Sequence, residues 1–451
     1  MGLTRTRRQN QKQARNPTAN KGEITVSAFI FLTLPFAGSE LSYRYSMLVC
    51  VNGTVRMNRR GFLGLTVASA RLGRGQQKPR QEAVVAAASR DRTPRVGIVT
   101  SNFRGSSDHD GTAIPGLADP RPVDADLTQA QIDAMVAKAL DLGSPLQGGL
   151  ASIIGPEDWV VIKPNIVSCY GLGPEANDGG AHHPYIAGAV TDLRVVHSLV
   201  TYLAEHKYGA RITVAEGSGE WLPAERSKSS VDGWSTDWGG AFGGLSYRKM
   251  VEDFTRRYPG TRFEVMDLNF DQSVDLPVSG KALARNNPEG IYTIPKTIQQ
   301  CDRLISVAPF KTHAMTGVSL SMKNYFGIGS GAKYGFPKEG LHKLGHPNEV
   351  LIDLFSLHPA DYAIVGGSWG VEGDGPHPPG ARSVHHNVIV AGANAVAVDA
   401  VAAAAMGFRP VDLPYLGLAE KRGFGVADTD VIWTRGNDIE EAHKLFRKPA
   451  K

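Results

Sequence analysis

Cysteine is scarce in this 451-residue chain, which has three, at positions 50, 169 and 301. Three widely spaced cysteines cannot build a disulfide framework, and the sequence contains no CxxC pair to hold zinc or an iron–sulfur cluster by cysteine alone. No cysteine-ligated iron–sulfur cluster is therefore expected. Cys169 and Cys301 could pair, although two free core thiols are the simpler expectation.

Long apolar runs are also missing. The run at residues 24–37 has fourteen residues and contains Pro35, whereas a membrane-spanning helix needs about 20 apolar residues. The sequence therefore predicts no integral membrane domain. With 42% hydrophobic residues, the chain can nevertheless bury a large core.

The basic excess is confined to one end of the chain. Residues 1–90 hold 15 Lys or Arg and 3 Asp or Glu, a balance of +12, whereas the remainder holds 34 basic and 41 acidic residues, a balance of −7. Because the predicted folded body is acidic overall, nucleic acid is not expected as a partner.

Residues 57–64, Met-Asn-Arg-Arg-Gly-Phe-Leu-Gly, resemble a twin-arginine export signal. Arg71 and Arg74 interrupt the apolar stretch that follows, and residues 86–88 offer small side chains for cleavage. The resemblance implies the twin-arginine export machinery as a partner and a periplasmic or cell-envelope location. The alternatives are a disordered basic tail and a cytoplasmic protein.

This leader divides the chain into three expected parts. A twin-arginine motif belongs near the start of a protein, so Met57 is a candidate initiator and the residues before it are a candidate extension. The expected parts are an N-terminal extension (1–56), a signal segment with linker (57–93) and an α/β domain (94–451).

Strand and helix patterns alternate after residue 94. This rhythm predicts an α/β fold with a mixed, mostly parallel sheet and helices on both faces, in one domain or two lobes. Strands are expected at 95–100, 159–165, 211–217, 262–268, 291–294, 304–307, 362–365, 387–391 and 431–434. Helices are expected at 127–142 with Asp126 as a candidate cap, at 191–208, at 295–300, and at 395–406 with Asn394 as its cap. One more helix is expected after 410 and an amphipathic helix at the end.

Polar side chains follow several of these strands directly. Such residues meet at the carboxyl edge of a parallel sheet, which is where open α/β sheets bind ligands. Residues 316–326 are expected to form one or two helical turns after the strand at 304–307. The polar set is Lys163, Asn165, Glu216, Lys311, His313, Lys323 and Asn324.

Two acidic residues lie in a glycine-rich segment, residues 366–376, after another strand. Glu372 and Asp374 are candidates for binding a divalent cation or for proton transfer. A turn with solvated acids is the equal alternative. Asp399 is the one charge in a small-residue helix, so it must face a cavity or find a partner, either backbone amides or a lysine.

A long predicted loop and two histidines complete the candidate features of the sequence. Residues 222–244, rich in Gly, Ser and Trp, predict a long loop that is either a lid or an irregular excursion. His342 and His346 are predicted to be surface or capping histidines rather than metal ligands, because Gly345 and Pro347 interrupt any helix joining them.

The linked motifs resemble a bacterial and archaeal family known as domain of unknown function 362, or DUF362. The resemblance implies little about chemistry, since the family lacks an assigned reaction. Some members carry ferredoxin-type cysteine motifs that this chain lacks, and a distant likeness to nickel-pincer lactate racemases concerns the fold alone. The matching motifs are residues 162–165, 215–217, 309–313, 322–327, 370–376 and 397–401 with Gly407.

Three hypotheses of function follow. In the first, the protein is an exported enzyme for a small anionic metabolite, with His313, Lys311 and Lys323 as catalytic residues and a possible divalent metal. In the second, the same residues belong to a non-catalytic metal, cofactor or anion-binding protein. In the third, they form an internal salt-bridge network.

Overall fold

The structure is a computed structural model, and it describes residues 25–32, 47–54, 93–103, 124–167, 186–218, 245–335, 338–375 and 380–450. The chain divides into two compact units, Met1–Gly73 and Arg74–Lys451. In the first unit, β1 (Thr25–Leu32) pairs antiparallel with β2 (Met47–Thr54). The export motif and the expected lid at 222–244 lie outside the described residues.

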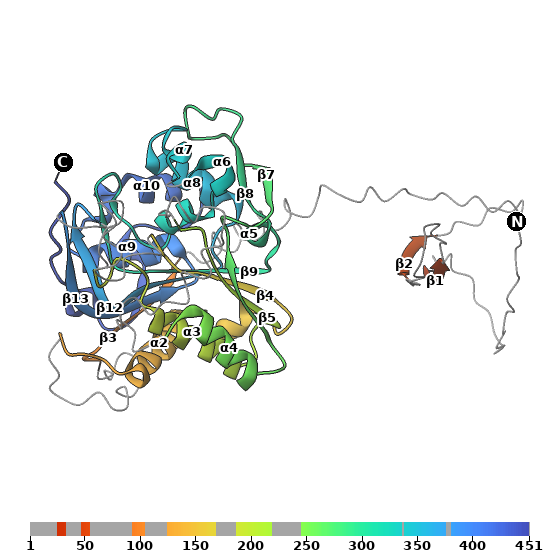
Figure 1. The fold of residues 1–451 in the computed structure, drawn as a ribbon, viewed down its shortest axis with the longest axis horizontal. Coiled ribbons are helices and arrows are strands. Elements are labelled where there is room, and N and C mark those ends of the chain that lie inside the picture. The colour runs from red at the N-terminus through yellow and green to blue at the C-terminus, as the bar shows by residue number, and fades with distance from the viewer. Residues whose placement is uncertain are drawn as a thin grey trace, which may run out of the picture. The chain divides into compact units, whose positions relative to one another are not determined.

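A single eight-stranded sheet forms the centre of the second unit (Figure 1). Its strand order is β14-β3-β13-β12-β9-β4-β5-β6. Only β13 runs against the other strands, because it pairs antiparallel with both β3 and β12 while every other pair is parallel. The expected mixed, mostly parallel sheet is thereby confirmed. The strands are β3 (Arg95–Thr100), β4 (Trp159–Lys163), β5 (Arg211–Glu216), β6 (Arg262–Asp267), β9 (Arg303–Ala308), β12 (Tyr362–Gly373), β13 (Ala381–Gly392) and β14 (Trp433–Gly436).

Helices cover both faces of this sheet (Figure 1). Alternate residues of a strand point to opposite faces, and accordingly Val161 belongs to one hydrophobic core whereas Val160 and Ile162 belong to the other. One face carries α2 (Gln129–Gly143), α3 (Leu193–Glu205) and α4 (Tyr247–Arg257), and the other carries α8 (Pro347–Leu357), α9 (Ala395–Ala405) and α10 (Pro414–Lys421).

The main helices begin at capping residues. Thr128 forms a capping box with Gln131 at the start of α2, and Asp192 and Asn394 accept backbone N–H groups at the starts of α3 and α9. These side chains satisfy amide groups that have no partner within the helix. The apolar stripes locate α2 and α3 from the sequence, and the cap Asn394 locates α9, whereas the expected cap Asp126 is replaced by Thr128.

Residues 366–373 of the glycine-rich segment form a strand rather than the expected loop. Strand β12 continues through it to Gly373 and pairs with β13 along its length, with a bulge between Gly367 and Trp369. A side chain at Gly366 would collide with the backbone oxygen of Val388. Glycine here serves close strand pairing rather than the approach of a ligand.

The segment after β9 also differs from the expected helix. Thr312–His313 (β10) pairs antiparallel with Gly317–Val318 (β11), and a 3₁₀ helix, η5, follows at Lys323–Ile328. Gly317 has a φ of +80°, which favours glycine and turns the chain back on itself. The hairpin places His313 and the helix places Lys323 at the same edge of the main sheet.

The remaining elements are short. No helix in the described ranges is both long enough and apolar enough to cross a membrane. The expected closing helix amounts to one turn, α11 (Ile439–Ala442), and the chain then runs on without helix or strand to residue 450. The other elements are η1 (Gly149–Ser152), β7 (Ser273–Pro277), β8 (Ile291–Pro295), α5 (Lys296–Gln300), α6 (Gly331–Tyr334), α7 (Glu339–His342), η6 (Pro410–Asp412) and η7 (Thr429–Val431).

Candidate functional site

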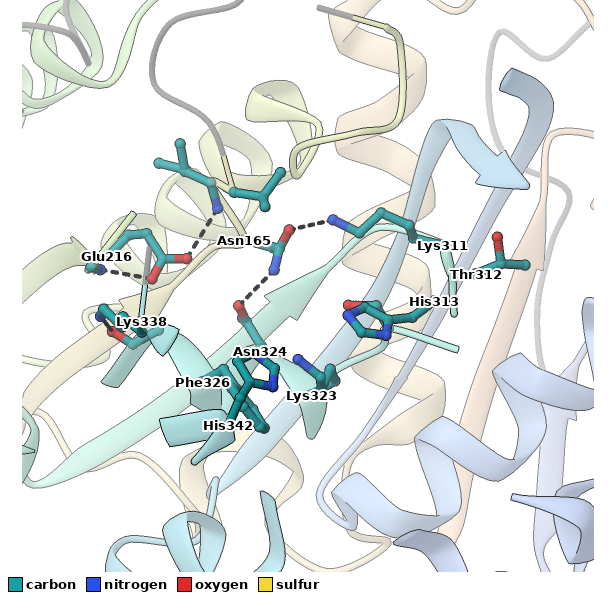
Figure 2. Close-up of a pocket in the computed structure, with 15 residues that line it drawn as sticks. Asn165, Glu216, Lys311, Thr312, His313, Lys323, Asn324, Phe326, Lys338 and His342 are labelled. Carbon is teal, nitrogen blue, oxygen red and sulfur yellow. Dashed lines mark hydrogen bonds between the residues drawn. The ribbon is translucent and has the colours of Figure 1, made fainter. Parts of the chain in front are cut away.

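A pocket of about 190 Å³ lies where the sheet strands β4, β5 and β9 end (Figure 2). Six of the predicted polar residues line it, and Lys163 lies directly behind its wall. Thus the structure brings together side chains that are up to 161 positions apart. The lining residues are Asn165, Ile166, Val167, Glu216, Gly217, Lys311, Thr312, His313, Ser319, Lys323, Asn324, Phe326, Gly327, Lys338 and His342.

A buried ion pair anchors one side of the pocket. Lys163 is the last residue of β4, and Pro164 then ends the strand because proline has no backbone N–H. The Lys163 Nζ donates to Glu216 Oε1 at 2.6 Å, and both side chains are nearly inaccessible to solvent. The other Glu216 oxygen accepts the backbone N–H of Ile166 at 3.0 Å. Burial lowers the pKa of Lys163, and the attraction of Glu216 opposes this effect.

Two asparagines connect this ion pair to the next lysine. The Asn324 oxygen accepts from Lys163 Nζ at 3.0 Å and from the Asn165 amide at 3.3 Å. The Asn165 oxygen in turn accepts from Lys311 Nζ at 2.8 Å, and Lys311 also donates to the Ala189 carbonyl at 2.9 Å. Figure 2 shows the part of this chain that joins Asn324, Asn165 and Lys311. Lys311 is therefore held by neutral oxygens, without a carboxylate among these partners.

Glycine permits the close packing around the ion pair. A Cβ at Gly327 would meet the Glu216 carboxylate and would lie 2.5 Å from Lys163 Nζ. The Gly327 carbonyl accepts a hydrogen bond from Lys338 Nζ at 2.8 Å. Burial lowers the pKa of Lys338 to about 7, while the charge of Glu216 opposes the shift. The sequence reasoning missed Lys338, for which the only signal was a Gly- and Lys-rich segment.

Lys323 differs from the other lysines of the pocket. Its Nζ lies 3.6 Å from the centre of the Phe326 ring, and no hydrogen-bond acceptor for it is found among the residues that the structure describes. Its side chain is 8% exposed and lines the pocket. Burial, together with the charges of Lys311 and Lys163, lowers the pKa of Lys323 to about 7. Near neutral pH, therefore, Lys323 exchanges between an ammonium ion and a neutral amine.

The His313 ring presents a hydrogen-bond donor to the pocket. Its Nδ1 accepts the backbone N–H of Met315 at 3.1 Å, so the ring hydrogen of neutral imidazole lies on Nε2. Burial, with the charges of Lys323 and Lys311, lowers the pKa of His313 to about 2. At physiological pH His313 is consequently neutral and donates from Nε2.

The two histidines after η5 have different positions. His342 lines the pocket, and its ring centre lies 5.1 Å from that of Phe326. His346 caps α8, accepting the backbone N–H of Asn348 at 3.3 Å. The capping prediction is therefore confirmed for His346, whereas His342 belongs to the pocket.

Asp399 supports the pocket from behind. It is fully buried, and its oxygens accept the backbone N–H groups of Ser321 and Met322 and the hydroxyls of Ser321 and Tyr415. Burial raises the pKa of Asp399 to about 6, against the effect of these four hydrogen bonds. Of the two expected partners, Asp399 thus uses backbone amides, and it holds the two residues that precede Lys323.

Glu372 and Asp374 do not line the pocket. Glu372 forms an ion pair with Arg382 and accepts the backbone N–H of Arg447 at 2.7 Å. Asp374 accepts the backbone N–H of Ala450 at 2.6 Å. Both acids therefore hold the C-terminal segment against the end of β12.

Glu372 and Asp374 do not form a metal site with other residues that the structure describes. Each Glu372 oxygen already has a partner, and no group of three His, Cys, Asp or Glu able to hold a metal is found within the described ranges. Cys301 is buried and its Sγ donates to the Ile298 carbonyl at 3.5 Å, while Cys169 lies outside the described residues. No chemical step is therefore derived through a metal.

Comparison with known proteins identifies a family for this chain and solved structures that are similar to part of it. No curated protein matches the chain. Among solved structures, the lactate racemase apoprotein from Thermoanaerobacterium thermosaccharolyticum is similar at 15% identity and a TM-score of 0.31. The match covers 56% of this chain and 52% of that one, so it spans about half the length of the racemase. A likeness this weak carries no argument about function.

The family match covers the part of the chain that builds the pocket. A family model described as "Domain of unknown function (DUF362)" matches residues 160–404, which is more than half of the 451 residues. This range includes every residue that lines the pocket, from Asn165 to His342. The chain belongs to the DUF362 family.

Proposed function

We propose that this protein is an enzyme that binds a small anionic metabolite in the pocket and uses Lys323 as its reactive amine. The observation that carries the proposal is the state of Lys323, a buried amine that faces a cavity without a hydrogen-bond acceptor among the described residues. An amine with a pKa near 7 can take up a proton or attack an electrophile at neutral pH.

The charge of the pocket supports an anionic substrate. Lys311, Lys323 and Lys338 line it, whereas Glu216 is its only carboxylate among the described residues and is already paired with Lys163. Buried charges without counterions are costly. A bound carboxylate or phosphate would add negative charge beside Lys323 and Lys338 and accept hydrogen bonds from Lys338 and from His313 Nε2.

The size of the pocket favours a small ligand. Its volume of about 190 Å³ is below the range of about 300–1,000 Å³ that is typical of sites for drug-sized ligands. The Phe326 ring offers an apolar surface beside the lysines. We therefore expect a compact anion of a few carbon atoms rather than a nucleotide.

Calorimetric titration with phosphate, oxalate and pyruvate tests binding, and mass spectrometry of the small molecules tests conversion. We expect saturable binding that Lys323→Met weakens and that the exposed-site variant Lys281→Met leaves unchanged. A compound that is converted by the natural chain and not by Lys323→Met establishes an enzyme. If none of the three anions binds, the proposal fails.

The second candidate is a non-catalytic anion-binding protein that uses the same lysines. It is favoured by Lys311 and Lys163, which are already held by neighbouring oxygens and could act only as fixed charges. Saturable binding without conversion of any compound, in a broad screen of small acids and phosphates, would support this second function.

Export by the twin-arginine route is a separate proposal that rests on Arg59 and Arg60. Replacing both arginines by lysine should abolish appearance of the protein in the periplasm, while a matched change of Arg71 and Arg74 should not. Equal export of the two variants would contradict the twin-arginine route.

A further inference from the structure

We propose that Lys323 forms a covalent imine with the carbonyl carbon of a small 2-oxo carboxylate bound in the pocket. This inference rests on the proposed function, because it names the substrate class of the same site. It follows from where the amine lies and from which groups surround it.

Lys323 has the surroundings of a nucleophilic amine. Its Nζ packs over the Phe326 ring on one side and faces the cavity on the other. Lysine becomes nucleophilic when it is removed from water or lies near other cations, since both effects favour the neutral amine. Four titratable groups interact electrostatically with Lys323. Lys311 and Lys163 lower its pKa, and Lys323 in turn lowers the pKa of His313 and of His342.

Lys338 and His313 would bind different parts of a 2-oxo acid, its carboxylate and its carbonyl oxygen. Among the described residues Lys338 Nζ donates to the Gly327 carbonyl, and the other N–H groups of its ammonium can hold the carboxylate of the ligand. His313 donates from Nε2 and is a neighbour of Lys323 in the pocket (Figure 2). A hydrogen bond from neutral imidazole to a carbonyl oxygen polarises the carbonyl toward attack.

The step balances without an oxidant or a reductant. The neutral amine of Lys323 attacks the carbonyl carbon, so that a nitrogen–carbon bond forms while the carbon–oxygen π bond breaks. One amine hydrogen passes to the oxygen, giving a carbinolamine, and the second leaves with that oxygen as water. His313 keeps its Nε2 hydrogen throughout and acts only as a hydrogen-bond donor. The product is an imine, with carbon doubly bonded to the lysine nitrogen.

Reductive trapping on the full chain tests this proposal. The protein is incubated with pyruvate and sodium cyanoborohydride at pH 6 and pH 8, and the modified lysine is located by peptide mass spectrometry. The pyruvate concentration is saturating at both pH values, so that the bound carboxylate keeps Lys338 protonated. We then expect one reduced adduct, on Lys323, and about a tenfold greater rate at pH 8, because the neutral fraction of an amine with a pKa near 7 rises by that factor. An exposed lysine such as Lys281 should react much more slowly at both pH values.

The mapping uses the natural chain, so it does not depend on the folding of a variant. Lys323→Arg keeps a cation and cannot form an imine; it should bind phosphate and give no adduct. An adduct on Lys338 or only on exposed lysines would overturn the proposal. Calorimetric binding of pyruvate without trapping would also overturn it while leaving the proposed function intact, whereas failure of every tested anion to bind would overturn both.

Discussion

Lys163 Nζ lies 2.6 Å from Glu216 Oε1, although the two residues end different strands of the sheet and are separated by 53 positions. Both side chains are almost inaccessible to solvent. The pair neutralises Lys163, which lies behind the pocket wall, and it occupies Glu216, the carboxylate among the described residues that line the pocket. Because Glu216 pairs with Lys163, its negative charge is not paired with a lysine that lines the pocket.

Glu216→Gln should destabilise the protein by about 3–5 kcal/mol, because it leaves the charge of Lys163 buried without its partner. The free energy of unfolding in urea measures this change. Asp412→Asn is the control, since the Arg409–Asp412 pair is exposed and should contribute at most about 1 kcal/mol. Equal effects of the two substitutions would contradict a structural role for the Lys163–Glu216 pair.

Stability should rise as the pH increases from 7 to about 10. The pKa values of Lys323 and Lys338 in the folded protein are about 7, below the usual value of about 10.4 for an unfolded chain. In this window the unfolded state binds more protons, so raising the pH favours folding, by up to about 1.4 kcal/mol per pH unit for each group. Urea unfolding at a series of pH values should show a smaller slope for Lys323→Met than for Lys281→Met.

His313→Ala should weaken phosphate binding roughly 10- to 100-fold, since one hydrogen bond to a charged group contributes about 1.5–3 kcal/mol. The loss should be the same at pH 5 and pH 9, because a pKa of about 2 keeps the ring neutral at both. Calorimetric titration at the two pH values checks this. A loss confined to pH 5 would instead indicate a cationic His313.

Asp399→Ala should cost about 3 kcal/mol or more, because it leaves buried backbone amides and two hydroxyls without their acceptor. Tyr415→Phe removes only one of these donors and should cost about 1 kcal/mol. Unfolding in urea compares the two variants. An Asp399→Ala variant as stable as Tyr415→Phe would show that Asp399 does not hold the start of η5.

Periodic patterns in the sequence were enough for most of the sheet and its helices. Apolar runs located β4, β5 and β9, and the capping residue Asn394 located the start of α9, because alternation and capping are local properties. The glycines after Val365 were misleading. Glycine permits both a loop and a closely paired strand, and only the neighbouring backbone of β13 distinguishes the two.

The sequence by itself determined that lysines, asparagines and a histidine would meet at one sheet edge, since residues that end parallel strands share that edge. Tertiary structure alone decided the partner of each. Glu216 pairs with Lys163, and Lys338 lines the pocket. Glu372 contacts the C-terminal segment instead of the pocket, and Lys323 faces the cavity. Hydrogen bonds and burial depend on atoms far apart in the chain, and these contacts, rather than residue type, set the protonation of Lys323.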